Sequence, residues 1–372
     1  MFYPHRSAPH NPATAAGASC DDEAVSSSTS GSPPVRRDAP SSGPARTLGT
    51  APQAFLDPST DVPSFGAYEG KLPPFDLARA SLRDRILRNK RWVYVAIAAP
   101  DVWLSVAIVR TGYAATAFVF VYDLQGKRML VDRSALGPAF VSKVSADLHA
   151  PGEIASFALG GARLALTRRG HTLDLAVRFG DLEIDAMIDE QSGPPAISAI
   201  ADLGAGLVNG TEKRALLAVR GSARSGSREI GLDGGTAGYD YTHGLLPRHT
   251  KWRWAFGLGR DETGEPFGFN LVEGFVGQSE CAAFTAKGVV PVAEPRFDFD
   301  LEAPLRPWKL TAPGIDLAFE PGGMHAERTN LVVVRSRFVQ PVGTFTGTVR
   351  AGGRDVRIAG LPGVVEDQDV VW

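Results

Sequence analysis

Residues 173–188 alternate apolar and polar side chains with a period of two, and this feature constrains the fold more than any other in the chain. A Gly-Asp pair interrupts the alternation at its centre, as in a β-hairpin with a two-residue turn. Such a turn would pair Phe179 with Leu182 and place the apolar residues of both strands on one side. It would also place Arg178 opposite Glu183 on the polar side, which is a favourable cross-strand pair. We therefore predict an antiparallel hairpin here.

Similar alternation recurs along the chain and indicates an all-β fold. The chain of 372 residues contains 41 Gly and 27 Pro, and these punctuate nearly every gap between the runs. We expect about 20 strands and no alternation of strands with helices, which favours antiparallel barrels or sandwiches. The clearest further runs are residues 113–123, 154–159, 216–219, 250–257, 331–340 and 344–350.

Changes in composition suggest three regions. The first 60 residues contain nine prolines and ten serines and too few apolar residues to offset the entropy of ordering. We expect residues 1–70 to form a disordered arm. The Gly- and Ser-rich stretch Gly221–Gly238 is the natural break between two β units, at residues 71–238 and 239–372.

Residues 75–92 form the one segment with a helical apolar period. Its arginines surround a thin apolar face that includes Leu82 and Ile86. A basic amphipathic segment can touch a membrane surface, but this one is short. Packing of the helix on the mouth or wall of a barrel is the simpler interpretation.

Charge and hydropathy exclude several kinds of partner. The formal net charge is -2, so no global field attracts nucleic acid or an anionic membrane, and no nucleic-acid partner is expected. The most apolar stretch, residues 92–109, is divided by Pro100 and Asp101 and is too short for a spanning helix, so we expect no stable membrane insertion. The two cysteines, Cys20 and Cys281, are poorly placed for a disulfide. We expect a soluble, cytoplasmic protein, and the sequence gives no oligomeric state.

The segment from residue 239 to 256 carries the densest chemistry. If residues 248–256 are extended, Arg248, Thr250, Trp252 and Trp254 share one face. Two interpretations remain open for this face. Either the tryptophans are core residues and Arg248 pairs with Asp240, or the face lines a cavity for an apolar ligand. A barrel of about eight strands encloses enough space for one small ligand.

Metal and cofactor motifs are absent from the sequence. His243 and His249 are separated by Pro247 and have no third ligand nearby, so we expect no metal site. The glycines near residue 206 lack the spacing of a dinucleotide fingerprint, and we expect no cofactor. The acidic residues Glu366 and Asp367, close to Trp372, are either solvated or provide a carboxylate that forms an ion pair with Arg248.

These residues resemble an uncharacterised family, domain of unknown function 2804, over about residues 75–372. The resemblance rests on several short motifs. They are Thr211-x-Lys213, Asp240, Gly244, Arg248-x-Thr250-x-Trp252-x-Trp254-Ala255, Gly268-x-Asn270-Leu271, Pro307-Trp308, the run from Gln340 through Gly343 to Phe345 and Gly347, and Glu366-Asp367 with Trp372.

Through its fold, that family is remotely similar to the double lipocalin-like group of carotenoid hydratases, tocopherol cyclases and stress-survival proteins. The resemblance implies two lipocalin-like antiparallel β-barrels side by side, with apolar isoprenoid or lipid ligands in the enzymatic members. Fold alone does not transfer an activity. The chain departs from the family pattern at Gln368, where a histidine is usual, and near Glu280, which lacks a neighbouring asparagine.

Three functions follow as hypotheses. The first is binding of an apolar small molecule such as a lipid or isoprenoid by Arg248, Thr250, Trp252, Trp254 and Asn270. The second is hydration or cyclisation of an unsaturated apolar substrate, with Asp240 as proton donor and Tyr241 or Glu366 as alternates. The third is a structural or partner-binding β protein. A filled interior would favour the third, an apolar cavity the first, and a cavity with a desolvated acid the second.

Overall fold

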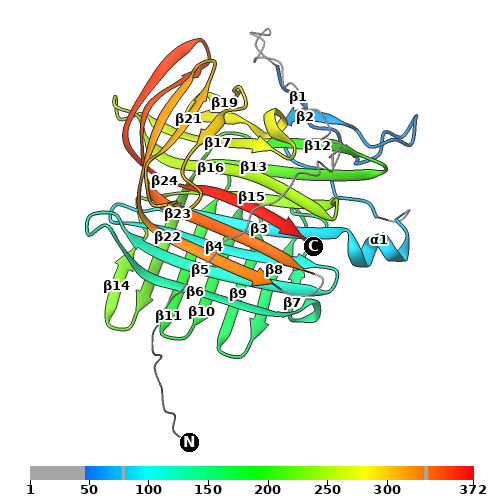
Figure 1. Cartoon of the computed structure of the whole chain (residues 1–372), viewed down its shortest axis with the longest axis horizontal. Helices are drawn as coiled ribbons and strands as arrows, with labels where there is room; N and C mark the ends of the chain where they lie inside the picture. The colour runs from blue at the N-terminus through cyan, green and yellow to red at the C-terminus, as the bar shows by residue number, and fades with distance from the viewer. Residues whose placement is uncertain (1–46, 78–79, 331–333) are drawn as a thin grey trace, which may run out of the picture. The chain divides into compact units, whose positions relative to one another are not determined.

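The computed structural model describes residues 47–77, 80–330 and 334–372, and in them the fold is almost entirely β. Within these residues the strands form two sheets of 15 and nine strands (Figure 1). All pairings are antiparallel except the short pair β1–β2. The predicted all-β fold is confirmed. The two expected antiparallel β-barrels are two curled antiparallel sheets, of which the first is a near-barrel and the second a half-barrel.

The first sheet follows the order β6-β5-β4-β3-β15-β13-β11-β10-β9-β8-β7, with β1, β2, β12 and β14 attached beside this path. Its curl brings β7 and β8, at one end of the path, into contact with β4 near the other end. Its strands are β1 (Gly49–Thr50), β2 (Gly66–Glu69), β3 (Asn89–Ala98), β4 (Val102–Thr111), β5 (Ala114–Asp123), β6 (Arg128–Pro138), β7 (Ser142–Val144), β8 (Gly152–Leu159), β9 (Ala162–Arg169), β10 (Thr172–Phe179), β11 (Leu182–Asp189), β12 (Ile197–Gly204), β13 (Leu207–Ser225), β14 (Arg228–Gly231) and β15 (Thr236–Leu245).

The predicted hairpin is β10–β11, and its predicted register is confirmed. Phe179 pairs with Leu182, and Arg178 lies opposite Glu183. The guanidinium of Arg178 nevertheless binds Asp185, at 2.7 Å. The expected ion pair is therefore wrong although the register that suggested it is right.

The second sheet has the order β19-β18-β17-β16-β24-β23-β22-β21-β20. Two short 3-10 helices, η1 (Ala139–Val141) and η2 (Gly277–Glu280), follow β6 and β17. The strands of this sheet are β16 (His249–Arg260), β17 (Pro266–Gly274), β18 (Ala282–Thr285), β19 (Gly288–Pro291), β20 (Arg296–Asp298), β21 (Trp308–Ala312), β22 (Ile315–Asn330), β23 (Arg335–Ala351) and β24 (Arg354–Val371).

The change from the first sheet to the second falls between Leu245 and His249. The stretch Gly221–Gly238, where the sequence suggested a break, instead contains the end of β13, all of β14 and the start of β15. The reason is that β15 pairs with both β13 and β3 and so lies in the middle of the first sheet. Its glycines permit turns and bulges within one sheet.

Two segments near the N-terminus differ from expectation. The helix α1 covers only Leu82–Leu87, because the chain from Asn89 onward pairs with β15 and β4 as strand β3. The expected disordered arm, residues 1–70, lies outside the described residues up to residue 46. Beyond that point β2 pairs with β12, and Phe55 is buried against Phe75. Burial of this aromatic ring helps to order residues that composition alone suggested were disordered.

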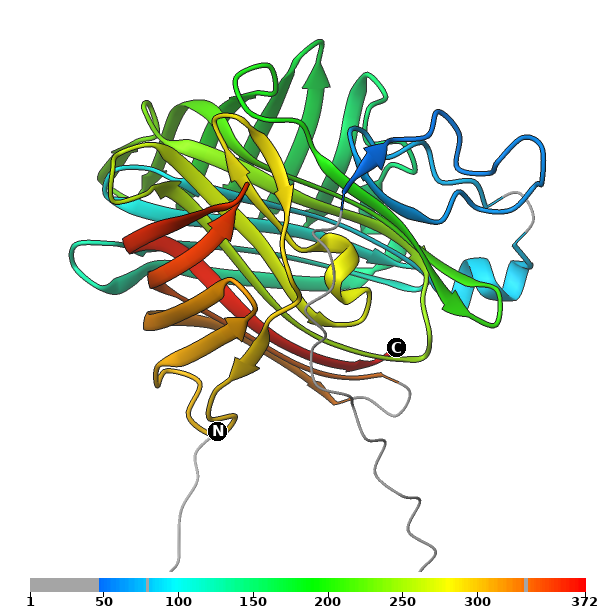
Figure 2. The same ribbon diagram turned by 90° about the horizontal axis from the view of Figure 1, so that it is seen from above.

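Two separate clusters of buried side chains follow from the alternation of strand residues. Along β3, Val93, Val95 and Ile97 point into the core of the first sheet. Their neighbours Tyr94 and Ala96 point the other way and pack in one cluster with apolar residues of the second sheet. Figure 2 shows strands of the second sheet lying along this outer face of the first sheet. The candidate site lies at this contact.

Candidate functional site

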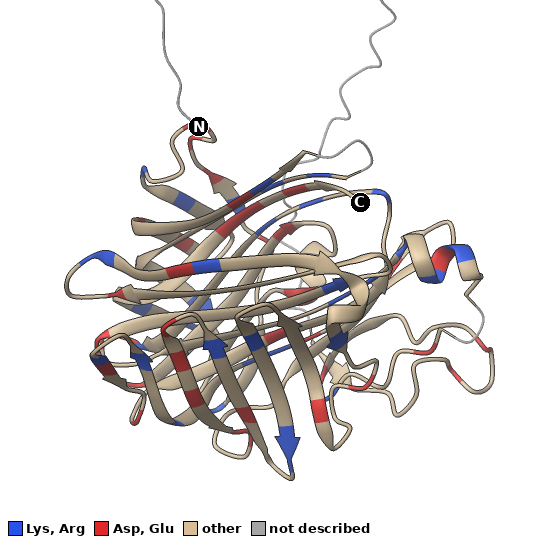
Figure 3. Ribbon diagram, turned by 90° about the horizontal axis from the view of Figure 1, so that it is seen from below, with Lys and Arg blue, Asp and Glu red and all other residues tan. Residues whose placement is uncertain are grey.

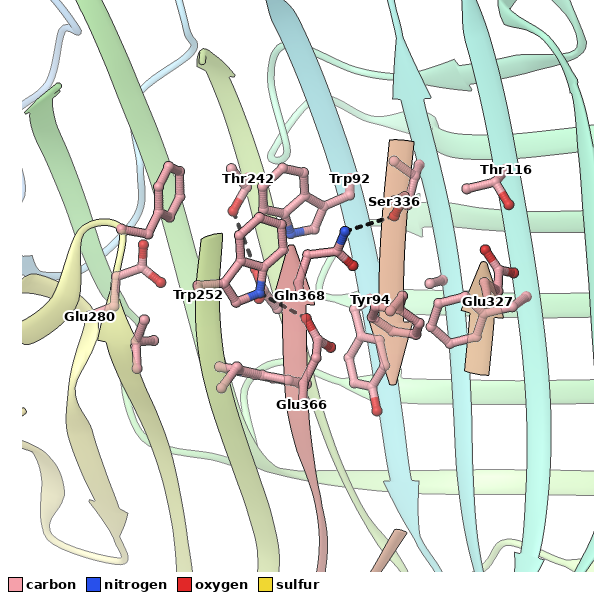
Figure 4. A pocket seen from close by; sticks show the side chains of 18 of the residues that line it. Trp92, Tyr94, Thr116, Thr242, Trp252, Glu280, Glu327, Ser336, Glu366 and Gln368 are labelled. Carbon is pink, nitrogen blue, oxygen red and sulfur yellow. Dashed lines mark hydrogen bonds between the residues drawn. The ribbon is translucent and has the colours of Figure 1, made fainter. Parts of the chain in front are cut away.

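A cavity of about 150 Å³ lies between the two sheets (Figure 4). It is not in the lumen of the first sheet, which is filled by its own apolar core. The walls are mostly apolar and aromatic. The lining residues are Trp92, Tyr94, Ala107, Val109, Thr116, Phe118, Lys213, Asp240, Thr242, Trp252, Trp254, Val272, Phe275, Glu280, Glu327, Ser336, Phe338, Glu366, Gln368 and Trp372.

The wall from the first sheet consists of two rows of directly paired residues. One row runs across β15, β3, β4 and β5, as Thr242, Trp92, Val109 and Thr116. The next row runs across the same strands and β13, as Lys213, Asp240, Tyr94, Ala107 and Phe118. Directly paired residues share a face of the sheet, so the register alone brings these side chains to one wall.

The wall from the second sheet is built in the same way. Trp252 on β16 pairs with Gln368 on β24, which pairs with Phe338 on β23. Trp254 pairs with Glu366 on one side and with Val272 on the other. The predicted strand at residues 248–256 therefore exists from His249 onward, and both of its tryptophans face the cavity.

A buried lysine with two carboxylates occupies one end of the cavity. Lys213 Nζ contacts Asp240 Oδ1, its cross-strand neighbour, and lies 3.1 Å from Glu280 Oε2. Glu280 comes from η2, so this cluster joins the two sheets. Burial disfavours the ammonium, but the charges of Asp240 and Glu280 outweigh burial and raise the pKa of Lys213. The lysine is therefore held as a cation.

Glu366 is buried, and in the described part of the chain both donors to its carboxyl group are neutral. Its Oε1 accepts a hydrogen bond from Trp252 Nε1 at 2.8 Å, and its Oε2 accepts one from Gln340 Nε2 at 2.7 Å. Figure 4 shows its carboxyl group directed at the indole of Trp252. Each carboxyl oxygen has further acceptor capacity, so a proton can be carried beside these two bonds.

Burial controls the protonation of both glutamates. It raises the pKa of Glu366 to about 7, against the two N–H donors, and the charge of Asp240 acts in the same direction. Burial also raises the pKa of Glu280 to about 7, against the attraction of Lys213. Carboxylic acids that retain a proton near neutral pH are suited to general acid catalysis.

A hydrogen-bonded network fixes the polar groups behind this wall. Tyr94 Oη lies 2.6 Å from Ser105 Oγ and 3.4 Å from Gln340 Oε1. Burial raises the pKa of Tyr94, so its phenol stays neutral. Asn270 accepts a bond from Trp254 Nε1 at 2.7 Å and donates one to the Glu280 carbonyl oxygen at 2.8 Å. These bonds orient both the indole and η2.

The structure brings together four of the eight predicted site residues. Trp252, Trp254, Asp240 and Glu366 line the cavity. The other four predicted residues do not line it: Tyr241, Asn270, Arg248 and Thr250.

Tyr241 points to the opposite face of β15, into the core of the first sheet, where its hydroxyl donates to the Ser145 carbonyl oxygen at 2.8 Å. A residue next to Asp240 along a strand must point away from it, and this excludes Tyr241 from the cavity. Asn270 acts behind the wall, as described above.

Arg248 and Thr250 lie at the start of β16. Arg248 is exposed and donates to the main-chain oxygen of Trp372 at 2.6 Å, so it does not head the cavity wall. Asp240, its expected partner, binds Lys213 instead. Thr250 is buried, bonds to Pro247, and accepts a bond from the indole of Trp372 at 3.0 Å.

Sequence reasoning did not identify Lys213, Glu280 or Tyr94 as site residues. The motif Thr211-x-Lys213 is part of the family resemblance, but the sequence near Lys213 does not indicate which carboxylates pair with this lysine. Its partners come from β15 and η2, and the register and the contact between sheets supply them. Gln368 lines the cavity and donates to Ser336 Oγ at 2.9 Å.

Two other kinds of feature are absent from the described part of the chain. No group of three or more His, Cys, Asp or Glu side chains there has the geometry of a metal site. Nor does any helix among those residues have the length and apolar character needed to cross a membrane.

Fold and site together define an all-β protein of two curled sheets with an acid-bearing apolar cavity between them. The chain belongs to the family described as domain of unknown function (DUF2804), whose model matches residues 48–372. No curated protein matches the sequence.

Several solved structures are similar at low identity. Kievitone hydratase from Nectria haematococca is 14% identical, with a TM-score of 0.46, over 82% of this chain and 97% of that one. A provisionally assigned AttH from Nitrosomonas europaea is 12% identical, with a TM-score of 0.46, over 80% and 98%. CghA is 10% identical, with a TM-score of 0.38, over 86% and 97%. Similarity at this level gives no information about activity.

Proposed function

We propose that the protein is an enzyme that transfers a proton to an unsaturated, largely apolar small molecule, and so hydrates or cyclises it. The observation that carries this proposal is Glu366: a buried carboxyl group that faces a mostly apolar cavity, accepts hydrogen bonds from the neutral donors Trp252 and Gln340, and has its pKa raised to about 7. A carboxyl group in such surroundings can donate a proton at neutral pH.

Glu366 is a better proton donor than Asp240, which the sequence favoured. Asp240 is engaged in an ion pair with the Lys213 ammonium, whereas Glu366 faces the cavity and accepts hydrogen bonds from Trp252 and Gln340. We therefore assign Asp240 to holding Lys213 and Glu280 in place. Trp252 and Gln340 orient the acid through their hydrogen bonds to it.

The proposed step begins with transfer of the Glu366 proton to one carbon of a double bond. The electron pair of the double bond forms the new C–H bond, and the neighbouring carbon becomes electron-deficient. Trp254 and Tyr94, whose rings meet edge to face with centroids 5.1 Å apart, both line this space, and aromatic rings can stabilise positive charge. In hydration, water attacks that carbon and then loses a proton. In cyclisation, a second double bond of the substrate attacks it, and the new carbocation loses a proton from a neighbouring carbon. In both cases the Glu366 carboxylate accepts the released proton.

The size of the cavity limits the substrate. A cavity of about 150 Å³ holds a group of roughly the size of one benzene ring. The reacting part of the substrate is therefore a single ring or a short branched chain, and any longer apolar tail extends through the mouth.

Binding without turnover is the second candidate, since the mostly apolar lining alone suits a ligand. The two functions are separated by incubating the protein with a panel of isoprenoids, quinones and unsaturated fatty acids in D₂O. Transfer of a solvent-derived proton to carbon adds deuterium to the product, which mass spectrometry detects. Tryptophan fluorescence titration detects binding in the same samples.

For the enzyme, Glu366→Gln should abolish deuterium incorporation and retain the fluorescence response, because the amide keeps the shape of the site but has no acidic proton. The matched control is Glu229→Gln on the exposed face of β14, which should leave both signals unchanged. Binding without deuterium incorporation in the unmodified protein would support the second candidate. Neither signal with any compound would contradict both.

A further inference from the structure

Exposed apolar side chains gather where α1 meets the turn between β4 and β5. Phe140 on η1 is 86% exposed, Leu82 on α1 is 73% exposed and Leu136 on β6 is 59% exposed. Ile86 and Leu87 of α1 are exposed as well. Single exposed apolar residues are common, but a contiguous group of them marks an interaction surface.

Backbone contacts place the elements that carry these residues around one turn of the first sheet. The carbonyl of Ile86 lies directly against Gly112, in the turn between β4 and β5. The next residue of that turn, Tyr113, accepts a hydrogen bond from the Ala139 backbone N–H at 3.2 Å, at the start of η1. The helix and η1 therefore flank the same turn. We call the exposed residues Leu82, Ile86, Leu87, Leu136 and Phe140 the apolar rim.

The apolar rim continues one wall of the cavity. Leu136 is the direct partner of Thr116, which ends the row Trp92, Val109 and Thr116 of the cavity wall. Leu136 thus shares a face of the sheet with these lining residues and lies at the outer end of their row. The row leads from the buried acid end of the cavity to the surface.

A second contact links α1 to the cavity. Lys90 Nζ donates to the Leu87 carbonyl oxygen at 3.0 Å and lies 5.0 Å from the centroid of the Trp372 ring. Trp372 lines the cavity. The side chain of Lys90 therefore connects the C-terminal end of the helix to Trp372 in the cavity wall.

The charge beside the apolar rim is positive. Arg83 and Arg85 on α1 are exposed, whereas the single acidic residue of the helix, Asp84, is paired with Arg88 at 3.2 Å. Figure 3 shows basic segments, in blue, on the helix α1 at the edge of the molecule. Exposed apolar side chains with neighbouring arginines match an anionic bilayer surface, where the apolar groups enter the headgroup region and the arginines meet lipid phosphates.

We infer that the apolar rim docks peripherally on an anionic membrane surface and that the mouth of the cavity opens at this contact. An apolar ligand dissolved in the bilayer would then reach the cavity along the row that ends at Leu136, without crossing water. The sequence allowed a membrane contact for the basic segment but favoured a packed helix. The structure leaves the apolar residues of α1 unburied.

Flotation of the full chain with vesicles tests this inference without any ligand. We expect the protein to float with vesicles of equal parts phosphatidylcholine and phosphatidylglycerol, and not with phosphatidylcholine alone. Phe140→Ser should weaken binding about tenfold, by loss of one inserted ring. Arg83→Gln and Arg85→Gln should each weaken it about fivefold. Added salt should weaken it further, because it screens the arginines.

Matched controls lie elsewhere on the surface. Leu305→Ser changes a leucine that is 53% exposed beyond β20, and Arg220→Gln changes an exposed arginine on β13. Both should bind vesicles like the unmodified protein. Glu366→Gln should also keep full vesicle binding, so failure of the proposed proton transfer would not be confused with failure of docking.

Three outcomes would overturn the inference. They are no flotation of the unmodified protein with anionic vesicles, equal loss of binding in the rim variants and the controls, and self-association. Self-association would appear as a dimer in sedimentation velocity that Phe140→Ser converts to a monomer while vesicles bind neither form. Because the substituted residues of the apolar rim, the arginines of α1 and the surface controls are exposed, we expect each of these variants to fold, and circular dichroism confirms folding for them and for Glu366→Gln.

Discussion

The indole of Trp252 and the carboxyl group of Glu366 meet diagonally across two neighbouring antiparallel strands, with 2.8 Å between Nε1 and Oε1. The direct partner of Trp252 is Gln368, and that of Glu366 is Trp254. Diagonal contacts of this kind are within reach of long aromatic side chains. A slip of one residue between β16 and β24 would turn one of the two groups to the opposite face, so the acid depends on this register.

The first prediction concerns the pH dependence of stability. Because burial raises the folded-state pKa of Glu366 to about 7, the folded state binds its proton more tightly than the unfolded chain. The resulting stabilisation is complete below the unfolded pKa and is lost as the pH rises through about 7. The free energy of unfolding should therefore fall by an amount of order 3 kcal/mol between pH 4 and 8 from this group alone, to which Glu280 adds with the same sign.

Urea unfolding at a series of pH values measures this effect. Glu366→Gln should reduce the slope of stability against pH, and Glu229→Gln should not. An unchanged slope in Glu366→Gln would show that Glu366 is ionised in the folded protein at neutral pH.

The second prediction concerns the buried cation. Lys213→Met leaves the carboxyl groups of Asp240 and Glu280 buried without a positive partner. We expect a loss of about 3–5 kcal/mol in the free energy of unfolding, from chemical denaturation at pH 8. The control Lys309→Met removes an exposed pair with Asp316 and should cost less than about 1 kcal/mol.

Adding Asp240→Asn to Lys213→Met should recover part of the loss, because one unpaired carboxylate is then neutral. The absence of any recovery would mean that Lys213 stabilises the fold through packing and not through charge. Such a result would also weaken the role given to Asp240.

The third prediction concerns Asn270, which connects Trp254 to η2. Asn270→Leu retains the size of the side chain but leaves Trp254 Nε1 and the Glu280 carbonyl oxygen without their bonds. Each buried unsatisfied group costs about 1–3 kcal/mol, so we expect a loss of roughly 2–6 kcal/mol by thermal or urea unfolding. Gln125→Leu removes an exposed bond to Asp101 and serves as the control, with a change near zero.

The fourth prediction concerns His325, which lies between the sheets against Phe118 and binds Asp132 at 2.6 Å. Burial disfavours the charged ring, but the bonds to Asp132 and Glu327 outweigh it and raise the pKa of His325 to about 9. Its stabilisation is complete below the unfolded pKa and is lost as the pH rises through about 9.

An NMR titration of the His325 ring should show this raised pKa in the unmodified protein and a lower one in Asp132→Asn. The control Asp316→Asn, an exposed carboxylate on the same strand as His325, should leave the titration unchanged. A titration near the ordinary histidine pKa in the unmodified protein would contradict the prediction.

Local pattern was enough to predict much of the fold. The alternation around Gly180 gives the register of β10–β11, and the alternation from Thr250 to Trp254 places both tryptophans on one wall. These features depend on residues that are neighbours in sequence or are joined by a tight turn. The limits of α1 were predicted less well, because pairing of β3 with β15 overrides the helical period after Asn89.

The polar half of the site could not be predicted from local pattern. Lys213, Asp240 and Glu280 converge because β13 pairs with β15 and because η2 of the second sheet meets the first. A guanidinium close in sequence to the tryptophans, Arg248, was therefore given the role of the cation, although it precedes β16 and is exposed. Pairing between strands that are distant in sequence therefore determines that Lys213, and not Arg248, is the cation that lines the cavity.

The cavity forms only when the two sheets pack together, because each sheet supplies one of its walls. A chain that had completed only its first sheet would expose Tyr94, Trp103 and Phe118 to water, since these side chains are buried in the cluster shared with the second sheet. During synthesis, this wall of the future cavity is therefore an exposed apolar surface until β16 and β24 have been made and pack against it. We expect that shielding of this surface, by a chaperone or by rapid completion of the chain, reduces aggregation during synthesis.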